Sequence, residues 1–230
     1  MATWKSADES LTELKAAMGA ELGELFHALS TELTWLHWRW KQYRILFGDK
    51  DSRIDIVNEA APFFFRMVQD VFFEDTLLGI ARLVGPPESA GKANLTITRL
   101  PPMIPSAPLR TKVEELIAKA KDSAAFAIDW RNRHLAHRDL DLALNASAAP
   151  LAPASRAAVE QALQALRDVL NHLDSTIRPT TTAYQMCPAI GDAEQALSVL
   201  RDGLLRERDR RLKWDKGELH EDDRSPPEAV

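Results

Sequence analysis

The stretch DWRNRHLAHRDL (129–140) brings several arginine and histidine residues together along the chain: Arg131, Arg133, His134, His137 and Arg138. An arginine is always charged, and its planar group of donors fits phosphate oxygens. A histidine titrates near neutrality and can accept or donate a proton. A stretch that holds both residue types could therefore bind a phosphate and transfer a proton.

Two histidines compete as the partner of Arg131. In a regular α-helix, Arg131 and His137 lie about 120° apart and roughly 9 Å apart along the axis, which is too divergent to bind one phosphate. They converge only if the helix ends or bends between them. His134, three residues after Arg131, shares its face in an unbroken helix. The spacing alone leaves both alternatives open.

The same stretch also fits a purely structural role. Arginine and histidine near a helix C-terminus interact favourably with the helix dipole, and HRDLD could form local ion pairs with Asp139 and Asp141. Short motifs specify function loosely, so on the stretch alone the structural role has the stronger claim. A functional reading therefore depends on the rest of the chain.

Apolar residues recur at steps of three or four through much of the sequence, which is the period of α-helices. The first stripe, Leu11 to Phe47, predicts one very long helix or two nearly collinear helices. Ser6 or Asp8 is expected to cap its start, and Gly48-Asp49 to end it. The stripe is long enough to support other helices packed along it.

A second helical region is expected from Ile54 to about Val84, with Pro62 either kinking it or opening a second helix. The composition then turns to Pro, Gly, Ser and Thr, which predicts a long loop over about 85–106. Within this loop, 95–100 could form a short turn of helix or an extended piece. The loop separates the aromatic-rich second helix from the segment that leads to Arg131.

Three further helices are expected, over about 106–128, from about 155 to 177 with a heptad-like seam, and from 192 onward. A loop over about 145–153 precedes the second of these, and Asp192 and Gln195 are spaced like a capping box. These elements predict an all-α, up-and-down helical bundle with long helices. We expect a single domain over 1–205 and a charged tail over 206–230 that frays and then becomes disordered.

Four segments occur in the order typical of one group of proteins: WKQYRILFG (40–48), NEAAPFFFRMVQDVFFEDTLLGIARLVGPP (58–87), GKANLTITRL (91–100) and RNRHLAHRDL (131–140). The chain resembles the HEPN superfamily and, within it, the AbiU-like HEPN domains of bacterial abortive-infection systems. The resemblance covers roughly 10–205, and the segment around Arg131 is its most specific part. One departure is Val84-Gly85, where the family often has Thr-Asp.

Catalytic HEPN proteins cut RNA without a metal. The resemblance implies that Arg131 and His137 are the catalytic pair here, with Asn132 as the supporting polar residue. It also implies a homodimer. The reaction needs two proton transfers, but each motif offers only one catalytic histidine. Two motifs that face each other across a two-fold axis would supply two histidines to one site. Arg133, His134 and Arg138 are the candidates for substrate binding, through electrostatic attraction for the RNA backbone.

Composition excludes several other classes. The net charge is −5, so the chain is not a bulk polyanion binder of the basic-tail kind. Cys187 is the only cysteine, which excludes an intramolecular disulfide framework and a cysteine-based zinc cluster. Neither a phosphate-binding glycine loop nor a membrane-spanning apolar run is present, and we expect no metal, no cofactor, no membrane association and a cytoplasmic location.

A second candidate surface surrounds His37, which is flanked by Trp35, Trp38 and Trp40. Aromatic rings can stack on nucleic-acid bases. Aromatic residues at helical spacing are nevertheless more often part of the core or of a dimer interface. This cluster is therefore the weaker candidate.

The leading hypothesis is a metal-independent endoribonuclease of the HEPN type that acts as a homodimer in phage defence or as a toxin. Its expected partners are RNA, a second copy of the chain and, for a toxin, an antitoxin protein. The alternative is a non-catalytic HEPN module that binds RNA, a nucleotide or a protein partner through the same surface.

Overall fold

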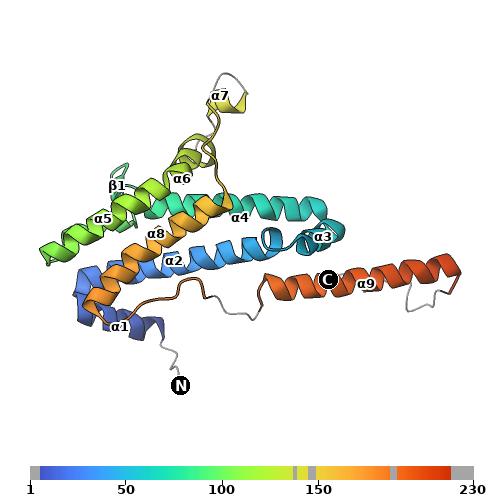
Figure 1. The fold of residues 1–230 in the computed structure, drawn as a ribbon, viewed down its shortest axis with the longest axis horizontal. Helices are drawn as coiled ribbons and strands as arrows, with labels where there is room; N and C mark the ends of the chain where they lie inside the picture. The colour runs from blue at the N-terminus through green and yellow to red at the C-terminus, as the bar shows by residue number, and fades with distance from the viewer. Residues whose placement is uncertain (1–5, 137–138, 145–148, 187–190, 219–230) are drawn as a thin grey trace. The chain divides into compact units, whose positions relative to one another are not determined.

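The computed structural model describes residues 6–136, 139–144, 149–186 and 191–218. Helices make up most of them (Figure 1), which confirms the predicted all-α class. The chain forms two compact units. The first comprises 1–40 and 72–187, and the second comprises 41–71 and 188–230. The predicted division into one domain and a tail stays a prediction.

The N-terminal stripe forms two helices, α1 (Ala7–Met18) and α2 (Ala20–Phe47). Of the two predicted caps, Ser6 is the one that caps α1: its hydroxyl accepts from the Glu9 N–H at 3.2 Å, and the Glu9 carboxylate accepts from the Ser6 N–H at 2.8 Å. The expectation that two such helices are collinear is wrong. At Gly19 the chain has φ +89°, and a Cβ on Gly23 would lie 2.7 Å from the Leu14 backbone, whereas collinear helices would separate these residues by about 13 Å.

Pro62 opens a new helix, as one of the two predicted alternatives stated. Helix α3 (Asp51–Ala60) ends just before it, and α4 (Pro62–Leu83) begins with it. A proline is favourable at this position because the first N–H groups of a helix have no intrahelical partner. The C-terminal half of α4 belongs to the first unit, where Leu77 and Ile80 are fully buried.

Helix α5 (Ala107–Ser123) packs along α8 (Arg156–Ile177) in the first unit. The predicted seam of α8 is buried through Val159, Leu163, Leu166, Leu170 and Leu173. Its burial in the core explains the regular spacing of these residues, because only one face of α8 meets the other helices. The chain after α5 continues into α6 (Ala125–Trp130).

The predicted loop after α4 contains more local structure than expected. Strands β1 (Glu88–Ser89) and β2 (Lys92–Ala93) form a small antiparallel hairpin, closed by Ala90 and Gly91 with φ of +50° and +73°. Two short 3₁₀ helices follow, η1 (Ile97–Arg99) and η2 (Pro101–Met103). Of the two alternatives for 95–100, a turn of helix is the one that forms.

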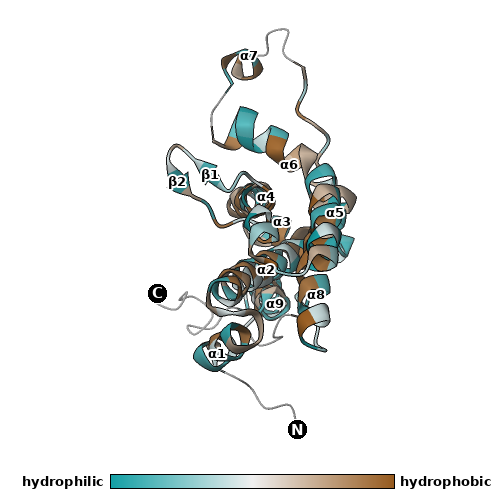
Figure 2. Cartoon of the chain, turned by 90° about the vertical axis from the view of Figure 1, so that its left-hand side faces the viewer, coloured by the Kyte–Doolittle hydropathy of each residue, from teal (hydrophilic) through white to brown (hydrophobic). Residues whose placement is uncertain are grey.

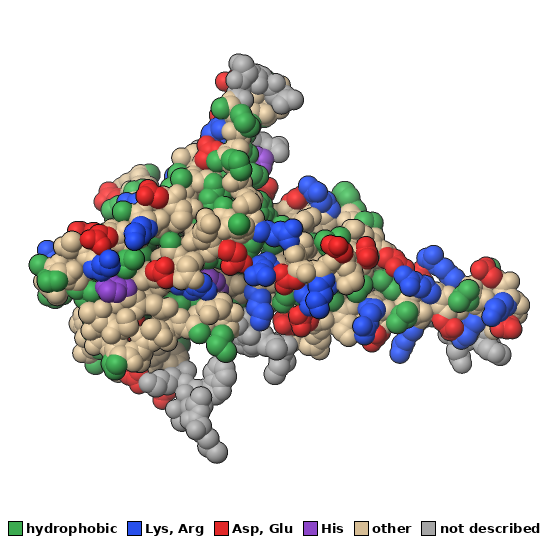
Figure 3. Space-filling view, viewed as in Figure 1, with side chains coloured by type: hydrophobic (Ala, Val, Ile, Leu, Met, Phe, Trp, Pro, Cys, Tyr) green, Lys and Arg blue, Asp and Glu red, His purple; other side chains and the backbone are tan. Residues whose placement is uncertain are grey.

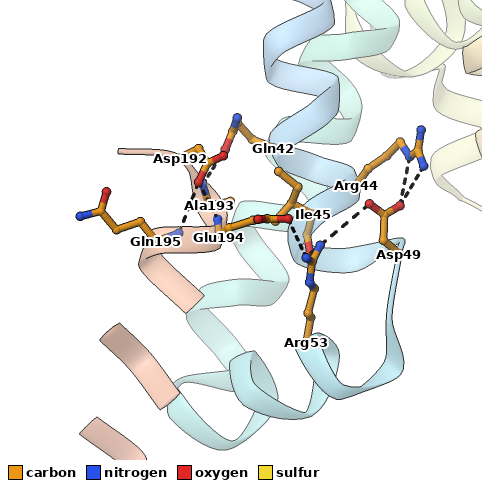
Figure 4. Close-up of polar contacts among 9 residues, drawn as sticks. All are labelled: Gln42, Arg44, Ile45, Asp49, Arg53, Asp192, Ala193, Glu194 and Gln195. Atoms are coloured by element: carbon orange, nitrogen blue, oxygen red, sulfur yellow. Dashed lines mark hydrogen bonds and ion pairs between the residues drawn. The ribbon is translucent and has the colours of Figure 1, made fainter. Parts of the chain in front are cut away.

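In the second unit, polar contacts hold the start of α9 (Ala193–Lys216) against the end of α2 and the start of α3 (Figure 4). The Gln42 side chain accepts from the Ala193 N–H at 2.7 Å, and Arg53 contacts Glu194 at 2.7 Å. Asp192 caps the helix as predicted. Gln195, however, accepts from the N–H of Gly191 at 2.9 Å, so the reciprocal half of the capping box is shifted by one residue.

Helix α9 continues past Arg206 to Lys216, and Figure 3 shows basic and acidic side chains interspersed along it. Its contacts with α3 include two hydrogen bonds from the Arg208 guanidinium to the Glu59 carboxylate. Among the described helices, none is both long and apolar enough to cross a membrane.

The aromatic cluster around His37 is divided between core and surface. Trp40 and His37 are buried, whereas Trp35 is 55% exposed. The His37 ring stacks on Tyr184, with ring centres 6.2 Å apart, and its Nε2 has no hydrogen-bond partner among the described residues. Burial, together with the nearby Arg167 charge, lowers the pKa of His37 from 6.5 to about 4. This histidine is therefore a neutral core residue at physiological pH.

The low pKa of His37 predicts a specific loss of stability in acid. The unfolded chain binds a proton at His37 as the pH falls through 6.5, whereas the folded chain binds it only near 4. The free energy of unfolding should therefore decrease across this window, and the His37→Gln variant should lack this part of the decrease. Between pH 7 and 4.5, urea unfolding should show the wild type losing about 2 kcal/mol more than the variant. Parallel losses in the two proteins would contradict the assignment.

Candidate functional site

A cleft of about 570 Å³ lies in the first unit where the end of α4, the hairpin loop and the segment after α6 meet. Figure 2 shows the β1–β2 hairpin and α6 close to α4. The polar residues that line the cleft are Glu32, Arg82, Ser89, Asn94, Arg131 and Asn132. The cleft thus contains the first two residues of the candidate motif.

The wall formed by the loop after α4 is held in place by threonine hydroxyls. The buried Thr96 places its Oγ1 2.9 Å from the carbonyl oxygens of both Leu83 and Gly85, so its single proton is shared between them. Thr98 donates to the Gly85 oxygen at 3.0 Å, and the Asn94 amide donates to the Pro86 oxygen at 3.0 Å. These bonds fix the chain where it leaves α4.

The opposite wall begins where α6 changes its winding. Residues Arg131–Leu135 form a π-helical turn, η3, in which the Ala136 N–H donates to the Arg131 oxygen at 2.8 Å, five residues back. A π turn is wider than an α turn and is commonly found at functional sites. The helical segment ends at Leu135, so the helix does end between the positions of Arg131 and His137. His137 and Arg138 lie outside the described residues.

Arg131 projects into the cleft with Asn132 beside it. Its Nε and Nη2 donate to the Asn132 Oδ1 at 3.0 and 2.7 Å. Its Nη1 lies next to Gly85, where an added Cβ would be 3.8 Å away. Among the described residues, no carboxylate forms an ion pair with Arg131. Asn132 therefore orients the guanidinium and leaves Nη1 facing the cleft.

His134 is not brought to Arg131. Its Nε2 lies 3.5 Å from the Glu74 carboxylate, and its ring meets the edge of Trp130 at 5.5 Å. Glu74 lies nine residues, or about 14 Å, before the end of α4 at Leu83. His134 therefore contacts the middle of α4, whereas Arg131 lies beside Gly85, which follows the helix.

Arg133 is engaged in contacts within its own segment. Its guanidinium lies 3.6 Å from Asp129 and 3.8 Å from Asp139, and it donates to the Ala149 oxygen at 2.5 Å. The ion pairs considered for HRDLD itself involve His137 and Arg138, which lie outside the described residues. Arg133 thus holds the returning loop against the end of η3.

Arg82 is a cleft residue that the sequence analysis missed. It lies in the last turn of α4, where basic residues are common because they interact favourably with the helix dipole. Its side chain is exposed and, within the described part of the chain, forms no hydrogen bond or ion pair. The only signal in the sequence was its place in the segment ARLVGPP, directly before Gly85.

A family model described as AbiU2, of the HEPN type, matches residues 19–196, well over half of the chain. The chain belongs to the AbiU2 family of HEPN proteins. The match includes every residue that lines the cleft, and it confirms the resemblance found in the sequence. No curated protein and no solved structure matches the chain significantly. In the described part of this HEPN protein, no cluster of three His, Cys, Asp or Glu residues is arranged to hold a metal.

Replacing Thr96 with valine should weaken the wall that carries Gly85. The substitution keeps the shape but removes the shared hydrogen bond to two carbonyl oxygens at a fully buried position. Urea unfolding should show a loss of about 1–3 kcal/mol. The Thr98→Val variant is the matched control and should lose less than about 1 kcal/mol, because Thr96 still binds the Gly85 oxygen. Equal losses in the two variants would show that the Thr96 hydroxyl stabilises this wall no more than the Thr98 hydroxyl does.

Proposed function

We propose that this HEPN protein is an endoribonuclease that cleaves RNA without a metal, in phage defence or as a toxin. The observation that carries the proposal is Arg131, an arginine that lines a cleft and has no carboxylate partner among the described residues. An arginine whose charge is not used within the fold is available for a phosphate. The end of the helix at Leu135 adds support, because a regular helix would turn Arg131 and His137 apart.

The reaction begins with attack of the ribose 2′-oxygen on the neighbouring phosphorus. The new O–P bond forms as the bond to the 5′-oxygen breaks, which gives a 2′,3′-cyclic phosphate and a free 5′-hydroxyl. A base removes the 2′-proton, and an acid protonates the leaving oxygen. Arg131 stabilises the charge that gathers on the phosphate, Asn132 orients Arg131, and His137 transfers a proton.

A homodimer supplies what one chain lacks. One His137 serves as base or acid, but the two proton transfers need two groups. A second copy related by a two-fold axis would bring a second Arg131 and a second His137 to the same cleft. The dimer is therefore part of the proposal, as is an antitoxin protein that covers the site if the protein is a toxin.

A non-catalytic binding module is the second candidate, and one observation favours it. Among the described residues that line the cleft, the side chains are arginine, asparagine, serine, glutamate and apolar groups, none of which ordinarily titrates near neutrality. On this alternative the same cleft binds RNA, a nucleotide or a protein partner without turnover. Cleavage and binding are separable in one assay.

The cleavage assay uses purified protein and RNA in the presence of EDTA. Wild type should give products that end in a 2′,3′-cyclic phosphate, and Arg131→Ala and His137→Ala should each reduce the rate at least about a hundredfold. His172→Ala, on α8, is the matched control for removal of a histidine and should keep the wild-type rate. Intact RNA with wild type and both variants alike would argue against the nuclease and for the binding module.

The His134→Ala variant tests the choice of histidine. His134 contacts Glu74 and Trp130, so its loss should lower the free energy of unfolding slightly and leave the cleavage rate within about threefold. Loss of activity in this variant, with His137→Ala still active, would show that His134 is the catalytic histidine.

Light scattering tests the dimer. The wild type should have twice the mass of one 25.7 kDa chain at micromolar concentration. A monomer that nevertheless cleaves RNA would exclude the composite site.

A further inference from the structure

The cleft holds a second arginine that no part of the proposed reaction uses. Arg82, from the last turn of α4, and Arg131, from η3, line the same cleft. Neither has a carboxylate partner among the described residues. Two cations that line one cleft raise its local positive potential in a chain whose net charge is −5. A positive potential of this kind favours the binding of an anion.

The carboxylate of Glu32 also lines the cleft, but it does not pair with these arginines. Glu32 forms an ion pair with Arg39 at 3.4 Å, and Arg39 in turn contacts Asp75 at 2.6 Å. These three residues form their own network along α2 and α4. Among the described residues, Glu32 forms an ion pair with neither Arg82 nor Arg131.

Gly85 keeps the approach to these cations open. Two nitrogens of the Arg131 guanidinium are already occupied by Asn132, and the third, Nη1, faces Gly85. The backbone at Gly85 does not have a positive φ, so the position does not require glycine for its conformation. What glycine provides here is the absence of a side chain beside Nη1. A ligand oxygen can occupy that space.

The size of the cleft limits the ligand. About 570 Å³ lies within the range of small-molecule sites and is enough for one nucleotide unit. Ser89 and Asn94 add hydrogen-bonding groups at the hairpin side. A base and its ribose can enter such a cleft only when they are not held in a helix, which is how proteins commonly recognise RNA.

We propose that Arg82 is a second phosphate-binding residue, and that Arg82 and Arg131 together hold one backbone phosphate of unpaired RNA beside Gly85. This inference rests on the proposed function for the identity of the ligand as RNA. It concerns binding and not cleavage. It adds to the motif a residue that lies 49 positions earlier in the sequence.

Binding is measured by fluorescence anisotropy with a labelled single-stranded oligonucleotide of about 12 nucleotides. Its riboses are 2′-O-methylated, so cleavage by 2′-oxygen attack cannot occur. Arg82→Ala should weaken binding about tenfold or more, because it removes a charge-assisted contact. The slope of log K against log salt should fall by about 0.7, as expected for one lost phosphate contact on a single strand.

Lys119→Ala is the control for the loss of one charge. Lys119 is an exposed residue of α5 and does not line the cleft. This variant should bind within about twofold of wild type and keep its salt slope. If Arg82→Ala and Lys119→Ala weaken binding equally, Arg82 makes no specific phosphate contact and the inference is wrong.

A second pair of variants tests the position of the phosphate. Gly85→Asp and Gly85→Asn introduce side chains of nearly the same size, and an added Cβ would meet the carbonyl oxygens of Ala81 and Arg82 at 3.3 Å in both. Both side chains can accept a hydrogen bond from Arg131 Nη1, but only the aspartate carries the negative charge that forms an ion pair with it and repels a phosphate. Gly85→Asp should therefore bind at least about fivefold more weakly than Gly85→Asn. Equal affinities would place the phosphate elsewhere.

Two competitors identify the form of the ligand. An unlabelled single strand should displace the probe, whereas a duplex of the same sequence and AMP should each compete at least about tenfold less well. Equal competition by the duplex or by AMP would overturn the proposal of unpaired RNA.

Failure of the proposed function can be distinguished from failure of this inference. If wild type cleaves no RNA yet binds the probe, and Arg82→Ala does not bind it, the nuclease proposal fails and the inference stands. A wild type that does not bind the probe overturns the inference, whatever its activity.

Discussion

The hydrogen bonds of the Thr96 hydroxyl determine where the chain goes after α4, and the cleft depends on that path. Leu83 is the last residue of α4 and Gly85 lies two residues beyond it, so no further intrahelical N–H reaches their carbonyl oxygens. A buried hydroxyl takes the place of the missing donors. The same bonds set the position of Gly85 relative to Arg131 and of the hairpin that carries Ser89.

The arginines of this cleft differ from others in the first unit in their ion-pair partners. Arginines elsewhere in the unit are bound within the fold: Arg39 to Asp75, Arg133 to Asp129 and Asp139, and Arg178 to the buried Asp174. Arg39 joins α2 to α4, whereas Arg178 pairs with a residue four positions earlier at the end of α8. Arg82 and Arg131 form no such ion pair among the described residues, and they line one cleft. The cleft is therefore distinguished by arginines without a carboxylate partner among the described residues, and not by the number of its arginines.

Local patterns in the sequence predicted the elements well. Apolar periodicity located the helices, Ser6 and Pro62 marked two of their starts, and the seam of α8 is the one that is buried. Tertiary contacts account for what was missed. The return of α1 onto α2 depends on the close approach of Gly23 to Leu14, and the strands of the hairpin are too short for any alternation to appear.

The candidate site was predicted in part for the same reason. Arg131 and Asn132 were found because they belong to a local motif, and both line the cleft. Arg82 was missed because a single basic residue in the last turn of a helix is ordinary. The contact of His134 with Glu74 joins residues sixty positions apart, which no spacing within the motif predicts. The π turn likewise has no residue pattern of its own.

That π turn has a consequence for how the segment can change in evolution. It holds one residue more than a regular turn of α-helix, so it is in effect an insertion that the helix has absorbed without breaking. Substitutions within RNRHL leave the helical phase unchanged. Deletion of a single residue from the turn would restore regular α-helical winding and leave the flanking segments in nearly the same phase, because the turn already absorbs that residue. The same deletion in a regular α-helix such as α5 would instead rotate one side by about 100° relative to the other.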